Sequence, residues 1–407
     1  MNYLLEDITV IDAASFLAGP AAATIMADYG ANVIKIEPPG GDGYRNLAGA
    51  YPVPYHWQLT SRNKRSLALD LGMPEGRAVL HRLIEKADVL TTNFLDSALK
   101  KYEMEYEQLK TINPRLIFAH ISGYGLKGPD VERRAFDITG WWARSGMMEL
   151  VRDPGQMPLG AAPGMGDHAT ATALYGAIMT ALYRREKTGE GGFVSTSLLA
   201  NGAWSNGMAL QGTIAGVDLA ANRQKPGSSL PFSSCYQCAD GRFVVLAAIN
   251  MAKEWPRLCR AINRTEWLND PERADFRYAI RNRVAAIEEI QAAIEQFDRD
   301  EVTARLDAEG VTHGVVPTMG EVIDDEQLRA NDIIIETGVK GDDYSLTVNS
   351  PIDLEGEDKR PPSRAPEIGA QSEEVLLEFG FTKDEVSQLL TRQAVRQHLP
   401  DEGFRQK

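Results

Sequence analysis

Short runs of aliphatic and β-branched residues alternate with longer amphipathic stretches through the first half of the chain. The apolar runs predict strands at residues 8–12, 32–37, 67–71, 89–93, 116–122 and 193–197. The stretches between them predict helices at residues 18–29, 74–86, 106–112 and 169–187. Strands that alternate with helices are typical of βαβ units. The pattern therefore predicts an α/β fold, a large Rossmann-like domain with a parallel, doubly wound sheet.

The pattern changes after about residue 215. A hairpin is expected at 231–248, helices near 251–263, 283–296 and 299–308, and a short apolar run at 314–316. A second hairpin at 333–349 and two helices near 371–379 and 382–391 follow. We therefore expect a large α/β domain at 1–215, a smaller α+β domain at 225–330, and a C-terminal segment at 331–407 that returns to the large domain.

Composition and net charge indicate which classes of partner the protein is expected to bind or to avoid. The 407 residues are 43% hydrophobic and 25% charged, which is ordinary for a globular protein. The 57 acidic residues outnumber the 43 basic ones and give a net charge of −14, so neither nucleic acid nor an anionic membrane is an expected partner. Glu6, Asp7 and Asp12 lie where a signal peptide needs basic residues, and no apolar run reaches about 18 residues. We expect a cytoplasmic protein.

The cysteines and histidines do not predict a metal site. Cys235 and Cys238 form a CxxC motif on an expected strand, where residues three apart point to opposite faces. Cys259 is the third cysteine, and the six histidines are scattered without metal-ligand spacing. Neither a metal nor a disulfide scaffold is expected.

Two motifs suggest nucleotide or anion binding, and each has a simpler interpretation. Residues 123–128 read GxGxxG, but Pro129 and Asp130 follow at once, so this segment is expected to be a loop and not the start of a dinucleotide-binding helix. Arg62, Lys64 and Arg65 are clustered in an acidic chain. They form either a site for phosphate oxygens or a solvated loop, and the residues leave both open.

Asp167 is the candidate nucleophile. It follows Gly164 and Gly166 and precedes the helix expected at 169–187. Glycines permit a sharp turn and close approach of a substrate, and a helix N-terminus favours an ionised carboxylate. Asp167 is therefore either an accessible nucleophile or simply the N-cap of the helix, and the two interpretations are compatible.

Several blocks of sequence point to one family when they are taken together and in order. They are residues 8–12, 18–20, 30–42, 63–66, 69–71, 93–94, 123–125, 166–167 and 185–191. Together they resemble the family III CoA-transferases of the CaiB/BaiF type, a group that also includes α-methylacyl-CoA racemase. The resemblance runs from near residue 5 to about residue 392.

This resemblance implies a mechanism and a substrate. Asp167 occupies the nucleophile position of the family, where the aspartate forms an acyl anhydride and then a CoA thioester before an acceptor carboxylic acid takes the CoA. Acyl-CoA is then a substrate, with no metal and no permanently bound cofactor. Gly164 and Gly166 lie where the family supplies backbone N–H groups for the oxyanion.

The resemblance also assigns CoA contacts. These are Leu17 and Ala18 beside the CoA, Leu69, Asp70, Leu71 and Gly72 beside the adenine, Asn93 and Phe94 at a strand end, Lys101 where relatives often have Arg, and Arg134, Ala135, Phe136 and Asp137 along the pantetheine. Pro38 replaces a basic residue of the oxalate enzymes, and Lys64 and Arg65 are expected to compensate for it.

Other features of the family bear on the choice of reaction. Its racemases need a proton-transferring His where this chain has Phe136, so transfer is favoured over racemisation. A non-catalytic CoA-binding protein is the alternative from another class. The family also implies an interlocked homodimer.

The acyl group and the acceptor acid are left open between small dicarboxylates and bulkier groups. The glycine-rich closing loop of the oxalate enzymes is not obvious in residues 225–230. Trp141, Trp142, Met147 and Met148 are candidates for an apolar acyl pocket or for ordinary core.

Overall fold

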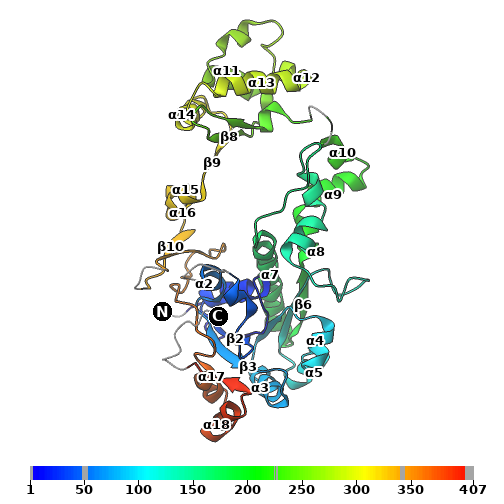
Figure 1. The fold of residues 1–407 in the computed structure, drawn as a ribbon, viewed down its shortest axis with the longest axis vertical. Helices are drawn as coiled ribbons and strands as arrows, with labels where there is room; N and C mark the ends of the chain where they lie inside the picture. Colours follow the sequence, from blue (N-terminus) through cyan, green and yellow to red (C-terminus); the bar gives the residue numbers. More distant parts are fainter. Residues whose placement is uncertain (1–2, 48–53, 224, 226–227, 340–343, 399–407) are drawn as a thin grey trace. The chain divides into compact units, whose positions relative to one another are not determined.

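The computed structural model describes residues 3–47, 54–223, 225, 228–339 and 344–398 (Figure 1). These residues form two compact units. The first unit combines the described residues of 1–149, 159–211 and 330–407, and the second comprises those of 150–158 and 212–329. The first unit is therefore built from separate pieces of chain, and most of the second is inserted before the last piece.

A seven-stranded sheet forms the centre of the first unit, in the order β12-β3-β2-β1-β4-β5-β6. The strands are β1 (Thr9–Asp12), β2 (Asn32–Glu37), β3 (Arg65–Leu69), β4 (Val89–Thr92), β5 (Ile117–Ser122), β6 (Gly192–Ser197) and β12 (Val395–Arg396). Strands β1 to β6 pair in parallel, and β12 is antiparallel to β3. The expected mixed α/β fold with a mostly parallel sheet is confirmed.

Neighbouring residues of each central strand face two different hydrophobic cores. Val10 and Val33 belong to a core that includes residues of α1 (Ala18–Asp28) and α7 (Met165–Thr188). Ile11 and Ile34 face the opposite core, which includes residues of α3 (Pro74–Ile84), α5 (Tyr106–Ile112), α17 (Ser372–Glu378) and α18 (Lys383–Thr391). Strands buried on both faces are nearly continuous apolar runs, which explains why the sequence predicts them well.

The first unit contains further short elements. They are η1 (Gly43–Asn46), α2 (Tyr55–Ser61), α4 (Asp96–Lys101), the π-helical turn η2 (Ile138–Ala143), α6 (Met147–Leu150), α8 (Leu198–Ser205), the first residues of α9 (Gly207–Ile214), and the hairpin of β10 (Ile334–Glu336) and β11 (Leu346–Val348). The sequence pattern predicted the hairpin but not the short helices, because a single turn is too short to show a helical period.

The C-terminal segment packs against the first strands of the chain. In Figure 1 the red helices α17 and α18 lie near α3 and β3. Arg62 forms a buried two-point ion pair with Asp28 at 3.0 and 2.7 Å and donates to the carbonyl oxygen of Val348 at 2.9 Å. This contact joins β11 to the end of α1, residues that are far apart in sequence.

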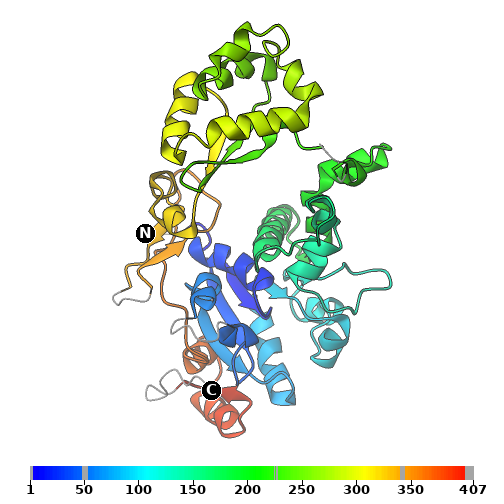
Figure 2. The ribbon, with the colours of Figure 1, turned by 45° about the horizontal axis from the view of Figure 1, so that its top comes forward.

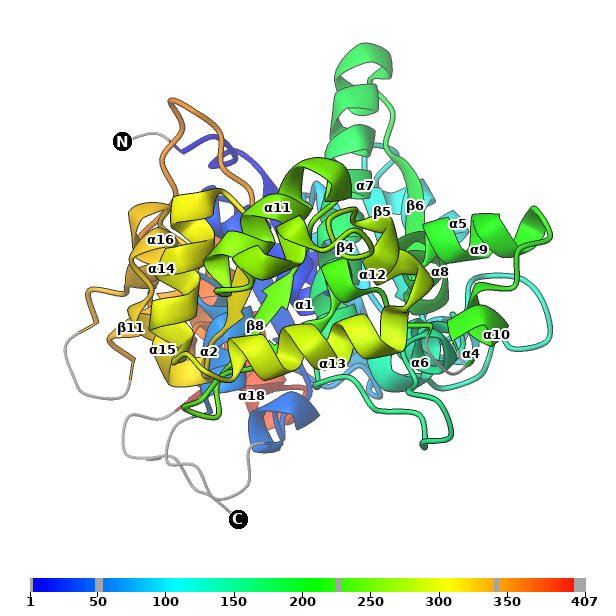
Figure 3. The ribbon, with the colours of Figure 1, turned by 90° about the horizontal axis from the view of Figure 1, so that it is seen from above.

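The second unit has a three-stranded antiparallel sheet of β7 (Cys235–Gln237), β8 (Phe243–Leu246) and β9 (His313–Val316). Its other elements are α10 (Leu219–Arg223), η3 (Pro231–Ser233), α11 (Met251–Ala261), η4 (Thr265–Asn269), α12 (Arg277–Arg281), α13 (Arg283–Ile294), α14 (Arg299–Glu309), α15 (Met319–Asp324) and α16 (Glu326–Ala330). Figures 2 and 3 show the green and yellow helices of this unit around its small sheet. Trp255, Leu258 and Ile290 are buried between them.

Candidate active site

The strand order creates a crevice at the carboxyl ends of β1 and β4. The sheet extends in opposite directions from these adjacent strands, and open α/β sheets bind ligands at such a switch point. A cavity of about 740 Å³ lies there. Its walls include Phe16 and Leu17 after β1, Asn93 after β4, and Asp167 at the start of α7.

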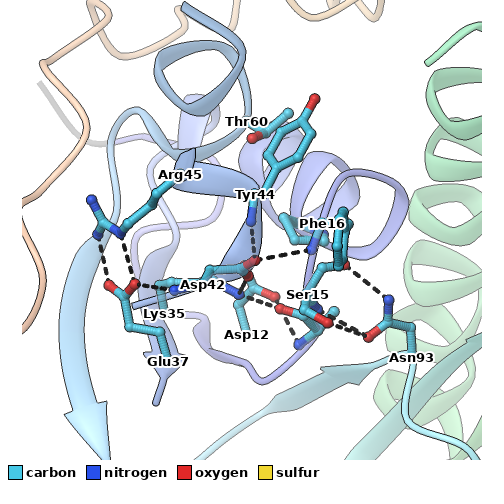
Figure 4. Close-up of polar contacts among 12 residues, drawn as sticks. Asp12, Ser15, Phe16, Lys35, Glu37, Asp42, Tyr44, Arg45, Thr60 and Asn93 are labelled. Carbon is cyan, nitrogen blue, oxygen red and sulfur yellow. Dashed lines mark hydrogen bonds and ion pairs between the residues drawn. The ribbon is translucent and has the colours of Figure 1, made fainter. Parts of the chain in front are cut away.

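Asn93 fixes the loop that follows β1. Its Oδ1 accepts the Ser15 N–H at 2.9 Å, and its Nδ2 donates to the Ser15 carbonyl oxygen at 2.9 Å (Figure 4). Both polar ends of the Asn93 amide therefore bind the neighbouring loop, while the residue lines the cavity. The contact joins the two strands at the crevice.

Phe16 adopts a left-handed backbone conformation in this loop, with φ of 64°. This conformation is unusual for a residue with a bulky side chain and needs support from its surroundings. The Asp42 Oδ1 accepts the N–H groups of Phe16 at 3.4 Å and Tyr44 at 2.9 Å. Lys35 forms an ion pair with Asp42 at 3.1 Å and donates to the Ala14 carbonyl oxygen. These contacts hold the aromatic side chain of Phe16 at the cavity wall.

Lys64 lies beneath this loop and is not available to a ligand. Its side chain is 0% exposed, and its ammonium group binds the Asp12 carboxylate at 2.8 Å and the Pro20 carbonyl oxygen at 2.7 Å. Burial and the nearby Lys35 lower the pKa of Lys64 to about 8, although Asp12 opposes the change. The expected phosphate contact of Lys64 is inconsistent with this geometry, because a buried cation needs its partner.

Arg65 and Lys101 lie outside the described linings of the cavities at this site. Arg65 forms ion pairs with Glu374 at 2.8 Å and Glu378 at 2.5 Å. Lys101 is exposed in the last turn of α4, 5.2 Å above the ring of Tyr102. Arg65 therefore connects β3 with α17, and we do not include it in the proposed CoA site.

Asp167 lies in the first turn of α7 and lines the cavity. The N-cap is Gly164, with φ of 89°, so Asp167 is not the N-cap residue. A Cβ atom on Gly166 would lie 2.6 Å from the Trp141 side chain, which explains the second glycine. Burial, with the nearby Asp137 carboxylate, raises the pKa of Asp167 to about 7. Desolvation by burial therefore opposes the stabilisation that the helix N-terminus is expected to give the ionised carboxylate.

Asp137 binds the turn that precedes Asp167. Its Oδ2 accepts the N–H groups of Gly164 at 2.8 Å and Gly166 at 3.3 Å, and its Oδ1 accepts the Ile138 N–H at 2.8 Å. The two glycine N–H groups expected to stabilise an oxyanion are thus already bound to Asp137. The helix start at Leu17 and Ala18 lines the same cavity.

A second cavity of about 310 Å³ contains the segment expected beside the adenine. Its walls include residues 69–72, Pro38 and the aromatic rings of Phe94 and Tyr102, whose centroids are 5.6 Å apart. Ser15, Phe16 and Phe94 line both cavities, so the two adjoin along these residues. Arg134, Ala135, Phe136 and Asp137 line the first cavity.

Sequence reasoning missed the aromatic residues from η1 and α2. Tyr44, Tyr55 and His56 line the first cavity. The rings of Tyr44 and His56 meet edge to face at 4.6 Å, and His56 Nε2 contacts the Tyr44 carbonyl oxygen. Desolvation by burial lowers the pKa of His56. The sequence shows no helical period at these residues, because η1 and α2 are too short to display one.

The other motifs singled out in the sequence do not add residues to this site. Residues 123–128 form a loop after β5, as expected, and the next helical turn begins only at Ile138. Trp141 and Met147 are buried with Leu198, and neither lines the described cavities. Cys235 is exposed and Cys238 is buried, in agreement with their opposite orientations. Pro226 and Gly227 of the candidate closing loop lie outside the described residues.

The described residues contain neither a candidate metal cluster nor a helix suited to a membrane. In residues 3–47, 54–223, 225, 228–339 and 344–398, no group of three His, Cys, Asp or Glu residues is placed to hold a metal ion. Within those same ranges no helix has the length and apolar character needed to cross a membrane.

Comparison with known proteins identifies the family. A model of the family described as CoA-transferase family III matches residues 5–372. The chain belongs to this family. The family III chain is 31% identical to (R)-2-hydroxy-4-methylpentanoate CoA-transferase of Clostridioides difficile, over 97% of this chain and 100% of the relative. It is 30% identical to cinnamoyl-CoA:phenyllactate CoA-transferase of Clostridium sporogenes, over 95% of this chain and 96% of the relative.

A solved structure agrees with this assignment. The crystal structure of a CAIB/BAIF family protein from Brucella suis superposes with a TM-score of 0.82 and 27% identity, covering 93% of this chain and 100% of that one. The chain is therefore a family III CoA-transferase, and the resemblance inferred from its sequence blocks is confirmed. CoA thioesters are the substrates of such enzymes.

Proposed function

We propose that this transferase moves CoA from an acyl-CoA to an acceptor carboxylic acid through covalent intermediates on Asp167. The proposal rests on the position of Asp167, a partly buried carboxylate in the wall of a cavity that adjoins a second, aromatic-lined cavity. A carboxylate is a weak nucleophile in water, and removal of water together with fixed orientation makes attack feasible.

The transfer takes four attacks. An Asp167 oxygen attacks the thioester carbonyl carbon, the C–S bond breaks, and an acyl-aspartyl anhydride and CoA thiolate form. The thiolate attacks the Asp167 carbonyl carbon and releases the donor carboxylate. An acceptor carboxylate then attacks the aspartyl-CoA thioester and releases the thiolate. The thiolate finally attacks the new acyl carbonyl, which restores the Asp167 carboxylate and gives the new acyl-CoA. No net proton is consumed.

The first turn of α1 is the source of oxyanion stabilisation in this proposal. Leu17 and Ala18 line the cavity at the N-terminus of an 11-residue helix. The first N–H groups of a helix have no partner within the helix, and the dipole favours negative charge there. Donors of this kind stabilise the charge that develops on a carbonyl oxygen.

We place the adenine of CoA in the cavity lined by residues 69–72, Phe94 and Tyr102. The pantetheine chain then follows Phe94 and residues 134–137 toward Asp167, all of which line the adjoining cavity. Arg134, at this wall, is the cation that we assign to the CoA phosphates in place of Lys64.

The cavity composition favours a bulky apolar acyl group. The ring centroid of Phe16 is 5.5 Å from that of Phe136 and 6.1 Å from that of Tyr44, and all three line the cavity with Asp167. Two relatives are named for branched or aromatic 2-hydroxy acids, whereas others are named for succinyl-CoA. We propose a branched or aromatic acid, because the free carboxylate of a dicarboxylate needs a cationic partner. Of the two arginines at this wall, Arg134 is assigned to the CoA phosphates and Arg133 forms an ion pair with Asp130 at 3.4 Å.

Phe136 supports transfer over racemisation. Its phenyl ring lines the cavity at the position where the racemases of the family have a histidine, and it cannot exchange a proton.

We also propose that the protein is a homodimer. Trp204 of α8 and Met208 of α9 are 84% and 89% exposed in the single chain. Large apolar side chains that gather on a surface mark interaction sites.

The covalent route is tested by intact-protein mass spectrometry after incubation with cinnamoyl-CoA, 4-methylpentanoyl-CoA and succinyl-CoA. We expect a CoA adduct that hydroxylamine converts to a hydroxamate at Asp167, and we expect none in Asp167→Ala. The matched control is Asp96→Ala, which removes another carboxylate of the same cavity wall and should still be labelled.

Three results decide between the alternatives. Binding of CoA without any adduct across the panel would favour a CoA-binding protein. Labelling only by succinyl-CoA would overturn the proposed apolar acyl group. Solvent deuterium entering the α-carbon without an acceptor acid would indicate racemisation.

A further inference from the structure

We propose that Asp137 is a positioning residue for Asp167: it fixes the turn that presents the nucleophile and places a second negative charge beside it. The inference rests on the proposed role of Asp167. Asp137 does not itself exchange atoms with the substrate. It acts through the backbone and through the electrostatic field at the Asp167 carboxylate.

The Asp137 side chain is the hydrogen-bond acceptor of this turn. Asp137 Oδ2 accepts both the Gly164 and Gly166 N–H groups, at 2.8 and 3.3 Å, and Asp137 is 8% exposed. Gly164 has φ of 89°, and Gly166 packs against Trp141. With both N–H groups bound, the backbone leading into α7 is fixed, and Asp167 lies directly after it.

The second effect is electrostatic. The Asp137 carboxylate is the charged neighbour that, after burial, raises the pKa of Asp167. When Asp167 attacks a thioester, its negative charge passes to the CoA thiolate, so the repulsion between Asp137 and the Asp167 carboxylate is relieved. The charge of Asp137 therefore destabilises the resting carboxylate relative to the neutral anhydride and favours the covalent state.

Other titratable groups surround the same cavity, and their contributions must be separated from that of Asp137. They are Tyr44 from η1, Tyr55 and His56 from α2, Asp96 from α4, His120 from β5, and Arg133 and Arg134 from the loop before η2. His168 follows Asp167 on α7. The Asp137 carboxylate accepts both glycine N–H groups of the turn that holds Asp167.

The experiment measures the rate of hydroxylamine-trapped adduct formation in a single turnover from pH 5 to pH 9. In Asp137→Asn the amide oxygen still accepts an N–H, but the charge is gone. We expect the acid limb of the pH profile to move to lower pH by about one unit, with a slower plateau because a less basic carboxylate is a weaker nucleophile. Asp137→Ser is the second neutral variant, for use if the first is unstable.

Two controls make the result specific. Asp137→Glu keeps the charge, so its acid limb should stay near that of the wild type even where its rate falls. Asp88→Asn removes a carboxylate that binds the Thr9 N–H at 2.8 Å and Arg185 at 2.9 Å, and its acid limb should not move. An unmoved limb in both neutral variants overturns the role of Asp137. Failure of the wild type to form any adduct refutes the proposed function, which is a separate result.

Discussion

Asp167 combines two properties that oppose each other. It must be ionised to attack a thioester, yet burial and Asp137 favour its protonated form and raise its pKa from 3.8 to about 7. The folded protein therefore loses stability as the pH rises from about 4 to about 7, because the unfolded chain ionises this group more readily. Above pH 7 the loss is complete and constant. Burial of the Asp167 carboxylate thus lowers the folding stability at neutral and high pH.

Because the ionised Asp167 carboxylate lowers the stability of the folded protein, we predict that Asp167→Asn stabilises the protein at high pH. The gain should be absent near pH 4 and should reach at most about 4 kcal/mol at pH 8, where the wild-type carboxylate is charged. Urea unfolding at the two pH values measures it. Asp153→Asn, which changes an exposed carboxylate, serves as the control. Equal effects of Asp167→Asn at both pH values would contradict the prediction.

The sequence indicates the role of a residue only where the signal lies in its immediate neighbours. Asp167 became the candidate nucleophile because two glycines precede it, a helix follows it and the family resemblance places it at the nucleophile position. Its neighbour Asp137 is 30 positions away, and only the folded backbone brings the two together. Lys64 was placed in an anion site because a cluster of cations usually lies in water, but its ammonium binds Asp12, 52 positions away. A buried ion pair leaves no mark in the sequence around either partner.

At the scale of elements, a buried ion network holds the Phe16 loop at the crevice. Lys35 of β2 connects Asp42 with the Ala14 carbonyl oxygen, and Asp42 in turn holds the Phe16 N–H (Figure 4). The side chains of Lys35 and Asp42 are 0% and 1% exposed. Removal of one partner therefore leaves an uncompensated charge in the protein interior.

We accordingly predict that Lys35→Met lowers the free energy of unfolding by about 3 to 5 kcal/mol and weakens CoA binding. The double variant Lys35→Met with Asp42→Leu should recover part of the stability but not the binding, since the Phe16 N–H then loses its acceptor as well. Guanidinium unfolding and calorimetric CoA titration measure the two effects. Lys253→Met, at an exposed position of α11, should change neither. Unaltered CoA affinity in Lys35→Met would refute the link between network and loop.

The elements that the sequence predicted are those with a long apolar pattern. Strands β1, β2, β4, β5 and β6 and helices α1, α3, α5 and α7 lie close to their expected ranges. The two-residue strand β12 was missed because its pairing with Leu69 and Ala68 depends on residues more than 300 positions away. The π-helical turn η2, which contains no distinctive period, was missed for lack of a local signal.

At the scale of the whole molecule, the large unit leaves apolar surface that a single chain does not cover. Trp204 and Met208 belong to successive helices of this unit. Burial of such side chains against a second copy contributes roughly 25 cal/mol for each Å² of apolar area removed from water.

We therefore predict a mass near twice 44.7 kDa by light scattering at micromolar concentration. The double variant Trp204→Asp with Met208→Asp should shift this mass toward that of one chain, because charged side chains resist burial in an interface. Met319→Asp, which changes a methionine that is 76% exposed in the second unit, is the matched control. A wild-type protein that scatters as a single chain at all concentrations would exclude the dimer.

The antiparallel pairing of β12 with β3 also affects how the protein is made. A ribosome delivers β3 before residues 212–329 and delivers β12 only after all of them have emerged. The outer edge of β3 therefore remains unpaired while the inserted unit is translated, and unpaired strand edges promote aggregation. Nascent chains released before Val395 should depend on chaperones far more than chains that include β12 do.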